Sequence, residues 1–320
     1  MRVLITGGFG FIGSRLGQLL IQNGYEVLLG SRKLYNTPDW LPQAEVVQTD
    51  WNSKESLSKI CRGVDVVVHA SGMNAQESVD DPEKALVVNG RFIETLIESA
   101  ILKGVKKIIY LSTAHVYAAP LVGTINEHSP TTNPHPYATS HLAGERAVLE
   151  ASNNGKIDGV VARVSNTFGT PAHIQVNCWM LLVNELCRQV ISKKKLVLKS
   201  PGIQMRDFVS MMDVCRAIEY LIVTDVDTQE ENIVNIGSGK SCTVYEMALQ
   251  IQACCNDLWG FTPAIDKQQI TEKKKFAALN YQMNYLNQKN YEFIDNFEKE
   301  LKHLLHFCEI YFSDKVSVSK

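Results

Sequence analysis

The sequence predicts a doubly wound α/β fold, in which helices cover both faces of a seven-stranded parallel sheet. A smaller mixed α/β lobe is expected on the C-terminal side. Two observations carry this prediction. Short apolar runs alternate with longer helical patterns through most of the chain, which is typical of parallel sheets. In addition, the first apolar run leads directly into a glycine-rich turn and a helical pattern.

The glycine-rich turn predicts a binding site for a dinucleotide. Val3–Ile5 is typical of a buried strand, three glycines follow at three-residue spacing, and Ser14–Gln22 has a helical pattern. The first glycine permits a sharp turn, the second lets a pyrophosphate approach the backbone, and the third allows the helix to pack closely. Free N–H groups at the helix start favour the phosphates. The contacts predicted in this turn are Gly7, Gly10, Phe11, Ile12 and Gly13.

Six more strands are expected, because short runs rich in β-branched residues recur along the chain. These runs are Glu26–Leu29, Ala44–Thr49, Asp65–His69, Lys107–Leu111, Gly159–Val164 and Asn232–Ile236. Helices are expected at about 82–103, from Pro136 onward, at about 174–192, after the segment Arg206–Asp213 up to about Thr224, and through most of 240–320. Loops are expected at 120–136 and 192–195.

The end of the second strand favours NADP(H) over NAD(H). An Asp or Glu at this place would accept hydrogen bonds from a ribose 2′-hydroxyl. The chain has Ser31 and Arg32 instead, which could donate hydrogen bonds to a 2′-phosphate and neutralise its charge. The alternative is that Arg32 and Lys33 form a solvated turn.

Other cofactor contacts are expected where later strands end and in the long helix. Asp50 and Trp51 follow the third strand, where they could hold an adenine edge. Ala70 and Ser71 follow the fourth strand, and they are small enough for a cofactor to lie across the strand tip. Asn89, in the helix expected at 82–103, is the last of the predicted cofactor contacts.

Composition argues against several other classes of function. The net charge of −2 gives no long-range attraction for nucleic acid or an anionic membrane. No apolar run approaches the roughly 18 residues of a membrane-spanning helix. The eight cysteines form no C-x-x-C pair, so neither a metal site nor a disulfide framework is expected. We therefore expect a cytoplasmic protein that binds small molecules.

Several further motifs join the glycine turn in one order along the chain. They are Ser112–Tyr117, Tyr137 with His141 and Glu145, Arg163–Asn166, Arg206–Asp213 and Gly237–Gly239. With these motifs, about residues 1–250 resemble the extended short-chain dehydrogenase/reductases, in particular the NAD(P)-dependent epimerases, dehydratases and ketoreductases of nucleotide-diphosphate sugars. The resemblance is weak over the last 70 residues or so.

The resemblance implies a Rossmann domain for the dinucleotide, formed by residues 1–166 and 205–237. A substrate-binding lobe would be formed by residues 167–204 and 238–320. Members of the family usually dimerise through the helix that carries Tyr137 and the helix before the fifth strand. A homodimer is therefore expected.

The resemblance also assigns roles to individual residues. Tyr137 would be the acid/base that exchanges a proton with a sugar hydroxyl or carbonyl, and Thr113 would hydrogen-bond the same oxygen. Asn166 and Arg206 would hold the diphosphate of the sugar nucleotide, and the fixed fork of an arginine suits that task. His141 would contact the nicotinamide ribose.

Two departures from the family pattern narrow the reaction. The family has a Lys at position 141, whose charge lowers the pKa of the tyrosine, whereas a histidine is mostly neutral near pH 7. Either turnover should be slower, or Tyr137 should work mainly as a protonated acid, which suits reduction of a ketone. Ala114 and His115 stand where 4,6-dehydratases carry Asp and Glu, so 4,6-dehydration is disfavoured.

The sequence thus predicts an NADP(H)-dependent enzyme that acts on a nucleotide-diphosphate sugar by 4-ketoreduction or epimerisation. His141 supports one alternative, a catalytically weak or silent dinucleotide-binding protein that acts as a sensor or partner. A reductase for a carbonyl compound other than a sugar is the second alternative.

Overall fold

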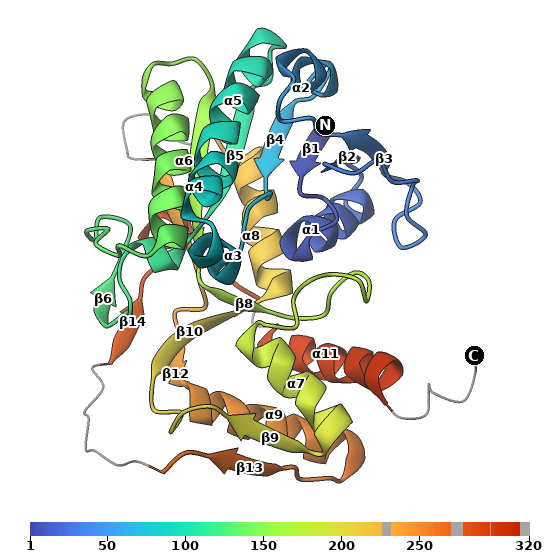
Figure 1. The fold of residues 1–320 in the computed structure, drawn as a ribbon, viewed down its shortest axis with the longest axis vertical. Helices are drawn as coiled ribbons and strands as arrows, with labels where there is room; N and C mark the ends of the chain where they lie inside the picture. The colour runs from blue at the N-terminus through green and yellow to red at the C-terminus, as the bar shows by residue number, and fades with distance from the viewer. Residues whose placement is uncertain (226–231, 270–277, 295, 314–320) are drawn as a thin grey trace.

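A parallel sheet of seven strands forms the centre of the computed structural model, which describes residues 1–225, 232–269, 278–294 and 296–313 (Figure 1). In chain order the strands are β1 (Arg2–Thr6), β2 (Glu26–Ser31), β3 (Glu45–Gln48), β4 (Val66–His69), β5 (Lys107–Thr113), β7 (Asp158–Val164) and β11 (Ile233–Ile236). Their order across the sheet is β11-β7-β5-β4-β1-β2-β3, and every neighbouring pair is parallel. The predicted fold class is confirmed.

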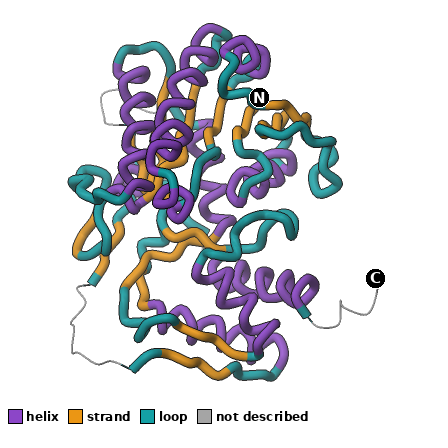
Figure 2. Tube along the Cα trace, in the orientation of Figure 1, coloured by secondary structure: helices purple, strands orange, loops and turns teal. Residues whose placement is uncertain are grey.

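Helices cover both faces of this sheet (Figure 2). α1 (Phe11–Gln22) and α8 (Met211–Val223) pack on one face, and α2 (Lys54–Ile60), α5 (Phe92–Leu102) and α6 (Pro136–Asn153) pack on the other. Successive residues of β1 point to opposite faces, so Val3 and Ile5 join one core and Leu4 joins the other. Burial on both sides explains why the strands are continuous apolar runs.

The helical segment expected at 82–103 is three elements rather than one helix. α4 (Pro82–Ala85) runs into a π-helical turn, η1 (Leu86–Arg91), and then into α5; a separate short helix, α3 (Ala75–Asp80), precedes them. Glycines let η1 and α6 approach closely. A Cβ on Gly144 would lie 2.5 Å from the carbonyl oxygen of Asn89, and one on Gly90 would lie 3.0 Å from Cβ of Ala143.

The smaller lobe is mixed α/β and lies below the large sheet in Figure 1. Its core lies among α7 (Leu182–Lys193), α9 (Val244–Trp259) and α11 (Phe297–Phe312). One sheet joins β8 (Asn166–Phe168), β10 (Met205–Ser210) and β12 (Ser241–Thr243), and another pairs β9 (Lys195–Leu198) with β13 (Ala264–Lys267). The remaining elements are β6 (Gly123–Ile125), its partner β14 (Leu279–Tyr281), η2 (Ala114–Val116) and α10 (Asn284–Gln288).

Three local predictions of secondary structure are wrong. The expected loop at 120–136 contains β6, the helix expected from about 174 begins at Leu182, and Lys195 begins β9. β10 is a strand of the lobe's sheet, although it begins the segment 205–237 that we assigned to the dinucleotide domain; α8 and β11 of that segment do pack with the large sheet. The parts of the two expected domains at 226–231, 270–277, 295 and 314–320 lie outside the described residues.

A buried ion pair joins α6 to the large sheet. Nη2 of Arg163 on β7 lies 2.6 Å from Oε2 of Glu145 on α6, and both side chains are almost fully buried. Ser112 on β5 donates its hydroxyl to the same carboxylate at 2.5 Å. Three elements therefore meet at one carboxylate, and the middle of α6 is held to β5 and β7.

Glu145→Gln should lower the free energy of unfolding by about 3 kcal/mol, because the substitution leaves the buried Arg163 without its counter-charge. Urea denaturation followed by circular dichroism measures this change. Glu150→Gln, the same substitution at an exposed position of α6, is the matched control and should change stability by less than about 0.5 kcal/mol. Equal effects of the two substitutions would contradict the assigned role of the ion pair.

Candidate functional site

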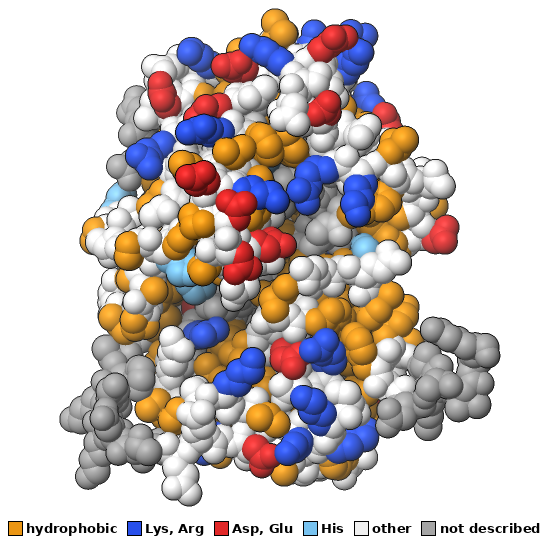
Figure 3. All heavy atoms as spheres, in the orientation of Figure 1, with side chains coloured by type: hydrophobic (Ala, Val, Ile, Leu, Met, Phe, Trp, Pro, Cys, Tyr) orange, Lys and Arg blue, Asp and Glu red, His pale blue; other side chains and the backbone are white. Residues whose placement is uncertain are grey.

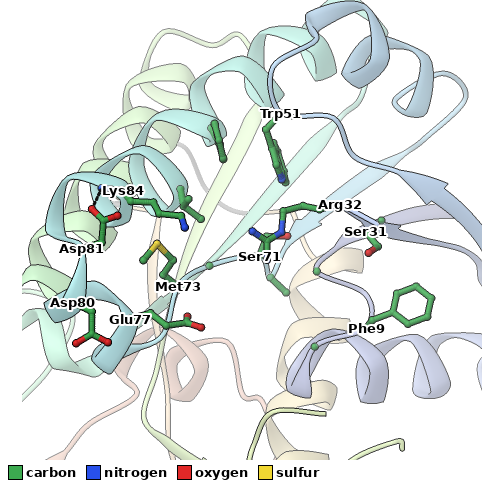
Figure 4. A pocket seen from close by; sticks show the side chains of 17 residues that line it. Phe9, Ser31, Arg32, Trp51, Ser71, Met73, Glu77, Asp80, Asp81 and Lys84 are labelled. Carbon is green, nitrogen blue, oxygen red and sulfur yellow. Dashed lines mark hydrogen bonds between the residues drawn. The ribbon is translucent and has the colours of Figure 1, made fainter. Parts of the chain in front are cut away.

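A cavity of about 500 Å³ opens at the carboxyl ends of β1, β2 and β4 (Figure 4). In doubly wound folds this edge of the sheet is where ligands bind. The sequence-predicted cofactor residues that line it are Gly7, Gly10, Ser31, Arg32, Trp51, Ala70 and Ser71. Lining residues that the sequence reasoning missed include Phe9, Met73, Glu77, Lys84 and Phe92.

The glycine turn has the geometry that a pyrophosphate requires. Gly7 has a φ of +71°, and a Cβ there would lie 2.7 Å from the carbonyl oxygen of Ala70. A Cβ on Gly13 would lie 2.4 Å from the carbonyl oxygen of Gly7, so the turn and the helix touch backbone to backbone. Gly10 caps α1 without a side chain, and the N–H groups of the first helical turn have no partner within the helix. The turn therefore fits a dinucleotide's phosphates.

The rim at the end of β2 carries a cation and no carboxylate. Arg32 extends over the cavity towards Ser71 in Figure 4 and forms no ion pair with a described residue. The hydroxyl of Ser31 accepts the backbone N–H of Lys33 at 3.2 Å. Trp51 forms a wall, since its ring stacks on Phe92 with centroids 5.4 Å apart and an interplanar angle of 6°.

Five predicted cofactor residues lie outside the lining of the cavity: Asp50, Asn89, Phe11, Ile12 and Gly13. Asp50 is exposed, and its side chain accepts the backbone N–H of Asn52 at 3.0 Å. Asn89 is fully buried in η1, where its Oδ1 accepts the N–H of Met73 at 2.7 Å and its Nδ2 donates to Oγ of Ser140 at 3.0 Å. Asn89 therefore shapes the loop that lines the cavity. Phe11 and Ile12 provide backbone at the start of α1 and are absent from the lining.

Acidic side chains gather over α3 at the edge of the hollow between the two halves of the molecule (Figure 3). Each has a local structural role. Glu77 forms a capping box with Asn74 at the start of α3, and Oδ1 of Asp81 accepts the N–H of Lys84 at the start of α4. The capping box is visible in the sequence, but its place beside the cavity is not.

Thr113, Tyr137 and His141 meet beside this cavity. Thr113 ends β5, and Tyr137 and His141 lie one turn apart at the start of α6, with ring centroids 4.6 Å apart and a near-perpendicular arrangement. Burial raises the pKa of Tyr137 above its ordinary value, and a hydrogen bond with Thr113 acts in the opposite direction. A Cβ on Gly72 would lie 3.9 Å from Cε1 of His141, so His141 lies just behind the cavity wall.

Two buried histidines at this site, His69 and His141, are held in their neutral form. Burial lowers the pKa of His141 to about 4. Burial, followed by the nearby His141, lowers the pKa of His69 to about 3. Nδ1 of His69 contacts Oγ1 of Thr6 at 2.8 Å, and the His69 ring stacks on Tyr110 with centroids 5.7 Å apart. The site therefore has no buried cation next to Tyr137 among the described residues.

Asn166 and Arg206 lie on neighbouring strands of the lobe, β8 and β10. Nδ2 of Asn166 donates to the carbonyl oxygen of Asp207 at 3.0 Å. Arg206 is half-buried, and burial lowers the pKa of its guanidinium. Its guanidinium donates a long hydrogen bond to Oε1 of Gln204 at 3.5 Å, and no described carboxylate pairs with it. The guanidinium is therefore available for an anionic ligand.

Among the described residues, no helix has the length and apolar character needed to cross a bilayer. No group of three or more His, Cys, Asp or Glu side chains in the same ranges is arranged to hold a metal ion.

Comparison with known proteins agrees with this geometry. The model of the NAD dependent epimerase/dehydratase family matches residues 3–237. A dTDP-6-deoxy-L-talose 4-dehydrogenase (NAD(P)(+)) of Kitasatospora kifunensis is 30% identical over 247 residues, which cover 76% of this chain and 75% of that protein. A UDP-glucose 4-epimerase of Streptomyces lividans is 28% identical over 260 residues, which cover 77% of this chain and 78% of that protein. The solved UDP-glucose 4-epimerase of Thermus thermophilus, in complex with NAD, superposes with a TM-score of 0.78 at 23% identity. The superposition covers 96% of this chain and 99% of that chain.

The protein should lose stability as the pH falls below about 6.5, the pKa of a histidine in the unfolded chain. Below that pH the unfolded chain binds protons at His69 and His141, whereas in the folded protein burial lowers the pKa of His69 to about 3 and the pKa of His141 to about 4. Each histidine should contribute about 1.4 kcal/mol per pH unit to this loss. Urea denaturation at several pH values from 7 to 5 measures the slope. His141→Gln should flatten it, whereas His303→Gln, at an exposed position on α11, should not. Identical slopes for wild type and His141→Gln would contradict the assignment.

Proposed function

Because this chain belongs to the NAD-dependent epimerase/dehydratase family, whose members are enzymes of the short-chain dehydrogenase/reductase type, we propose that it modifies a nucleotide-diphosphate sugar by hydride transfer. The reaction is 4-ketoreduction or epimerisation. One observation carries this proposal: the phenol of Tyr137 and the hydroxyl of Thr113 lie together beside a cavity whose glycine turn fits a dinucleotide. The relatives that act on dTDP- and UDP-sugars support the substrate class.

In this proposal Tyr137 supplies the proton of the reaction. A dinucleotide held at the glycine turn would supply the hydride for the carbonyl carbon of the sugar. The phenol of Tyr137 donates its proton to the carbonyl oxygen, which becomes a hydroxyl, and the tyrosinate takes a proton back from water. Thr113 hydrogen-bonds the same oxygen and holds it at the phenol. A raised pKa keeps Tyr137 protonated at neutral pH, which suits this direction.

The substrate's diphosphate would bind at Arg206 and Asn166. Arg206 has a guanidinium without a described carboxylate partner, and its fork matches two phosphate oxygens. Asn166 keeps one N–H and its carbonyl oxygen for a ligand while Nδ2 also bonds Asp207. A nucleoside diphosphate should therefore compete with the substrate, and Arg206→Ala should weaken that competition.

The choice between NAD(H) and NADP(H) depends on the residues at the end of β2, where Arg32 lines the rim of the cavity. The solved Thermus thermophilus relative holds NAD, so it gives no support to the preference for NADP(H) that we expected. No Asp or Glu stands at the end of β2 in this chain to accept the 2′-hydroxyl of NAD. We propose NAD(P)(H) as the cofactor, with Arg32 as the residue that discriminates between the two forms.

His141 favours a second candidate function, a catalytically weak dinucleotide-binding protein that acts as a sensor or partner. A neutral histidine stabilises a tyrosinate less than a lysine does. Incubation with 4-keto-6-deoxy sugar nucleotides and NADPH or NADH separates the candidates: turnover supports the enzyme, and tight cofactor binding without turnover supports the sensor. Turnover of simple ketones without protection by a nucleoside diphosphate would indicate a reductase for other carbonyl compounds.

We also propose that the chain acts as a homodimer through α5 and α6. Leu102 at the end of α5 is 65% exposed, and Leu86 in η1 just before α5 is 39% exposed, so each could be covered by a partner. Light scattering after size-exclusion chromatography tests the oligomeric state.

We also propose that the chain is divided into a dinucleotide domain and a substrate lobe, with β10 belonging to the lobe.

Tyr137→Phe should lower kcat by a factor of about 10²–10⁴, because the carbonyl oxygen loses its proton donor. The dissociation constant of the dinucleotide, measured by fluorescence titration, should stay within about twofold. Tyr25→Phe, at a position just beyond the C-terminal end of α1, is the control and should leave both values unchanged. A Tyr137→Phe enzyme with wild-type kcat would rule out the proposed role.

Arg32→Ala should weaken NADP binding by roughly 10- to 100-fold, which is the effect of losing a charge-assisted hydrogen bond. NAD binding should change little, since NAD has no 2′-phosphate. Isothermal titration calorimetry with both dinucleotides measures the four dissociation constants, and Lys33→Ala serves as the neighbouring control. An equal loss for both dinucleotides would show that Arg32 does not read the 2′ position.

A further inference from the structure

Tyr110 lies in the middle of β5 and connects β5, η1 and α6 next to His141. Its side chain is 1% exposed. Its hydroxyl lies 2.8 Å from the carbonyl oxygen of Asn89 in η1 and 3.0 Å from Nδ1 of His141 in α6. Gly144 leaves room for this arrangement, because a Cβ there would lie 2.5 Å from the hydroxyl oxygen.

The number of protons decides the direction of these two hydrogen bonds. A phenol has one hydrogen to donate, and a carbonyl oxygen can only accept. Tyr110 therefore donates to Asn89, and its oxygen must accept from His141. Because a neutral imidazole carries one N–H, His141 has its proton on Nδ1, and its Nε2 is an acceptor.

The acceptor edge of the ring lies towards the dinucleotide cavity. Cε1 of His141, which separates the two ring nitrogens, is the atom next to Gly72, and Gly72 lines the cavity. The ring also stands at 73° to that of Tyr137, with centroids 4.6 Å apart. A ligand hydroxyl that approaches this edge of the His141 ring would meet the lone pair of Nε2.

We propose that Tyr110 is a positioning residue, which holds His141 in the Nδ1–H tautomer so that Nε2 accepts a hydrogen bond from a ribose hydroxyl of the bound dinucleotide. This inference rests on the proposed function for its ligand, but the tautomer itself is a property of the free protein. A lysine can only donate at such a place, whereas this histidine accepts. The ribose hydroxyl is thus the donor in this site.

Nitrogen-15 NMR of histidine-labelled protein reads the tautomer directly. The chain has eight histidines, and the His141 signals are identified by their loss in His141→Gln. In the wild type at pH 7, Nδ1 should resonate as a protonated nitrogen and Nε2 as an unprotonated one. Protonation at Nε2 would overturn the proposal whatever the enzyme's activity.

Tyr110→Phe removes the acceptor of Nδ1–H, so the ring should shift towards the Nε2–H tautomer. Dinucleotide affinity should fall roughly tenfold, the effect of one hydrogen bond between polar groups. Tyr281→Phe removes an equally buried hydroxyl, which donates to the carbonyl oxygen of Arg163 at 2.8 Å, and should change neither the NMR pattern nor the affinity. Unchanged affinity in Tyr110→Phe with the tautomer altered would refute the ribose contact.

The outcomes separate this inference from the proposed function. A protein that shows the Nδ1–H tautomer but binds neither NAD nor NADP would contradict the proposed function and the ribose contact, while the role of Tyr110 in the free protein would stand. If Tyr110→Phe does not fold, the wild-type spectrum and its change on adding the dinucleotide decide: Nε2 should shift as it accepts a hydrogen bond. An unshifted Nε2 at saturating dinucleotide would overturn the proposal.

Discussion

The attachment of α6 to the large sheet is the constraint on which the rest of the site depends. Tyr137 and His141 are useful only if the first turn of α6 stays at the end of β5, beside the glycine turn. The buried pair of Glu145 and Arg163 fixes the helix one turn further along, where an unpaired charge would be costly. Gly144 removes the side chain that would otherwise push the helix away from Tyr110 and η1.

This close approach has a chemical consequence. It buries the imidazole of His141 and partly buries the ring of Tyr137, which lowers the pKa of the first and raises the pKa of the second, so both groups stay uncharged near neutral pH. A site with a lysine at position 141 would hold a permanent cation here and would favour the tyrosinate. The present site favours a protonated phenol, and so it is better matched to donating a proton than to removing one.

Much of the fold and part of the site could be predicted from the sequence. The seven strands were visible because each is buried on both faces, which requires a continuous apolar run. The residues at strand ends, such as Arg32 and Ser71, were predictable because the carboxyl ends of parallel strands meet at one edge. The short strands β6, β12, β13 and β14 were missed, since three or four residues with mixed burial carry too little pattern.

By itself, the sequence determined the sheet, the glycine turn and the identity of the groups that meet there, because these depend on neighbours along the chain. Only the tertiary structure decided what Asn89, Tyr110 and His141 do. A π-helical turn carries Asn89 inward to Met73 and Ser140, where it lies behind the loop that lines the cavity. The hydroxyl of Tyr110 meets His141 across 31 residues of sequence. Helical periodicity does not reveal such contacts, because they arise from the packing of η1, α6 and β5 against one another.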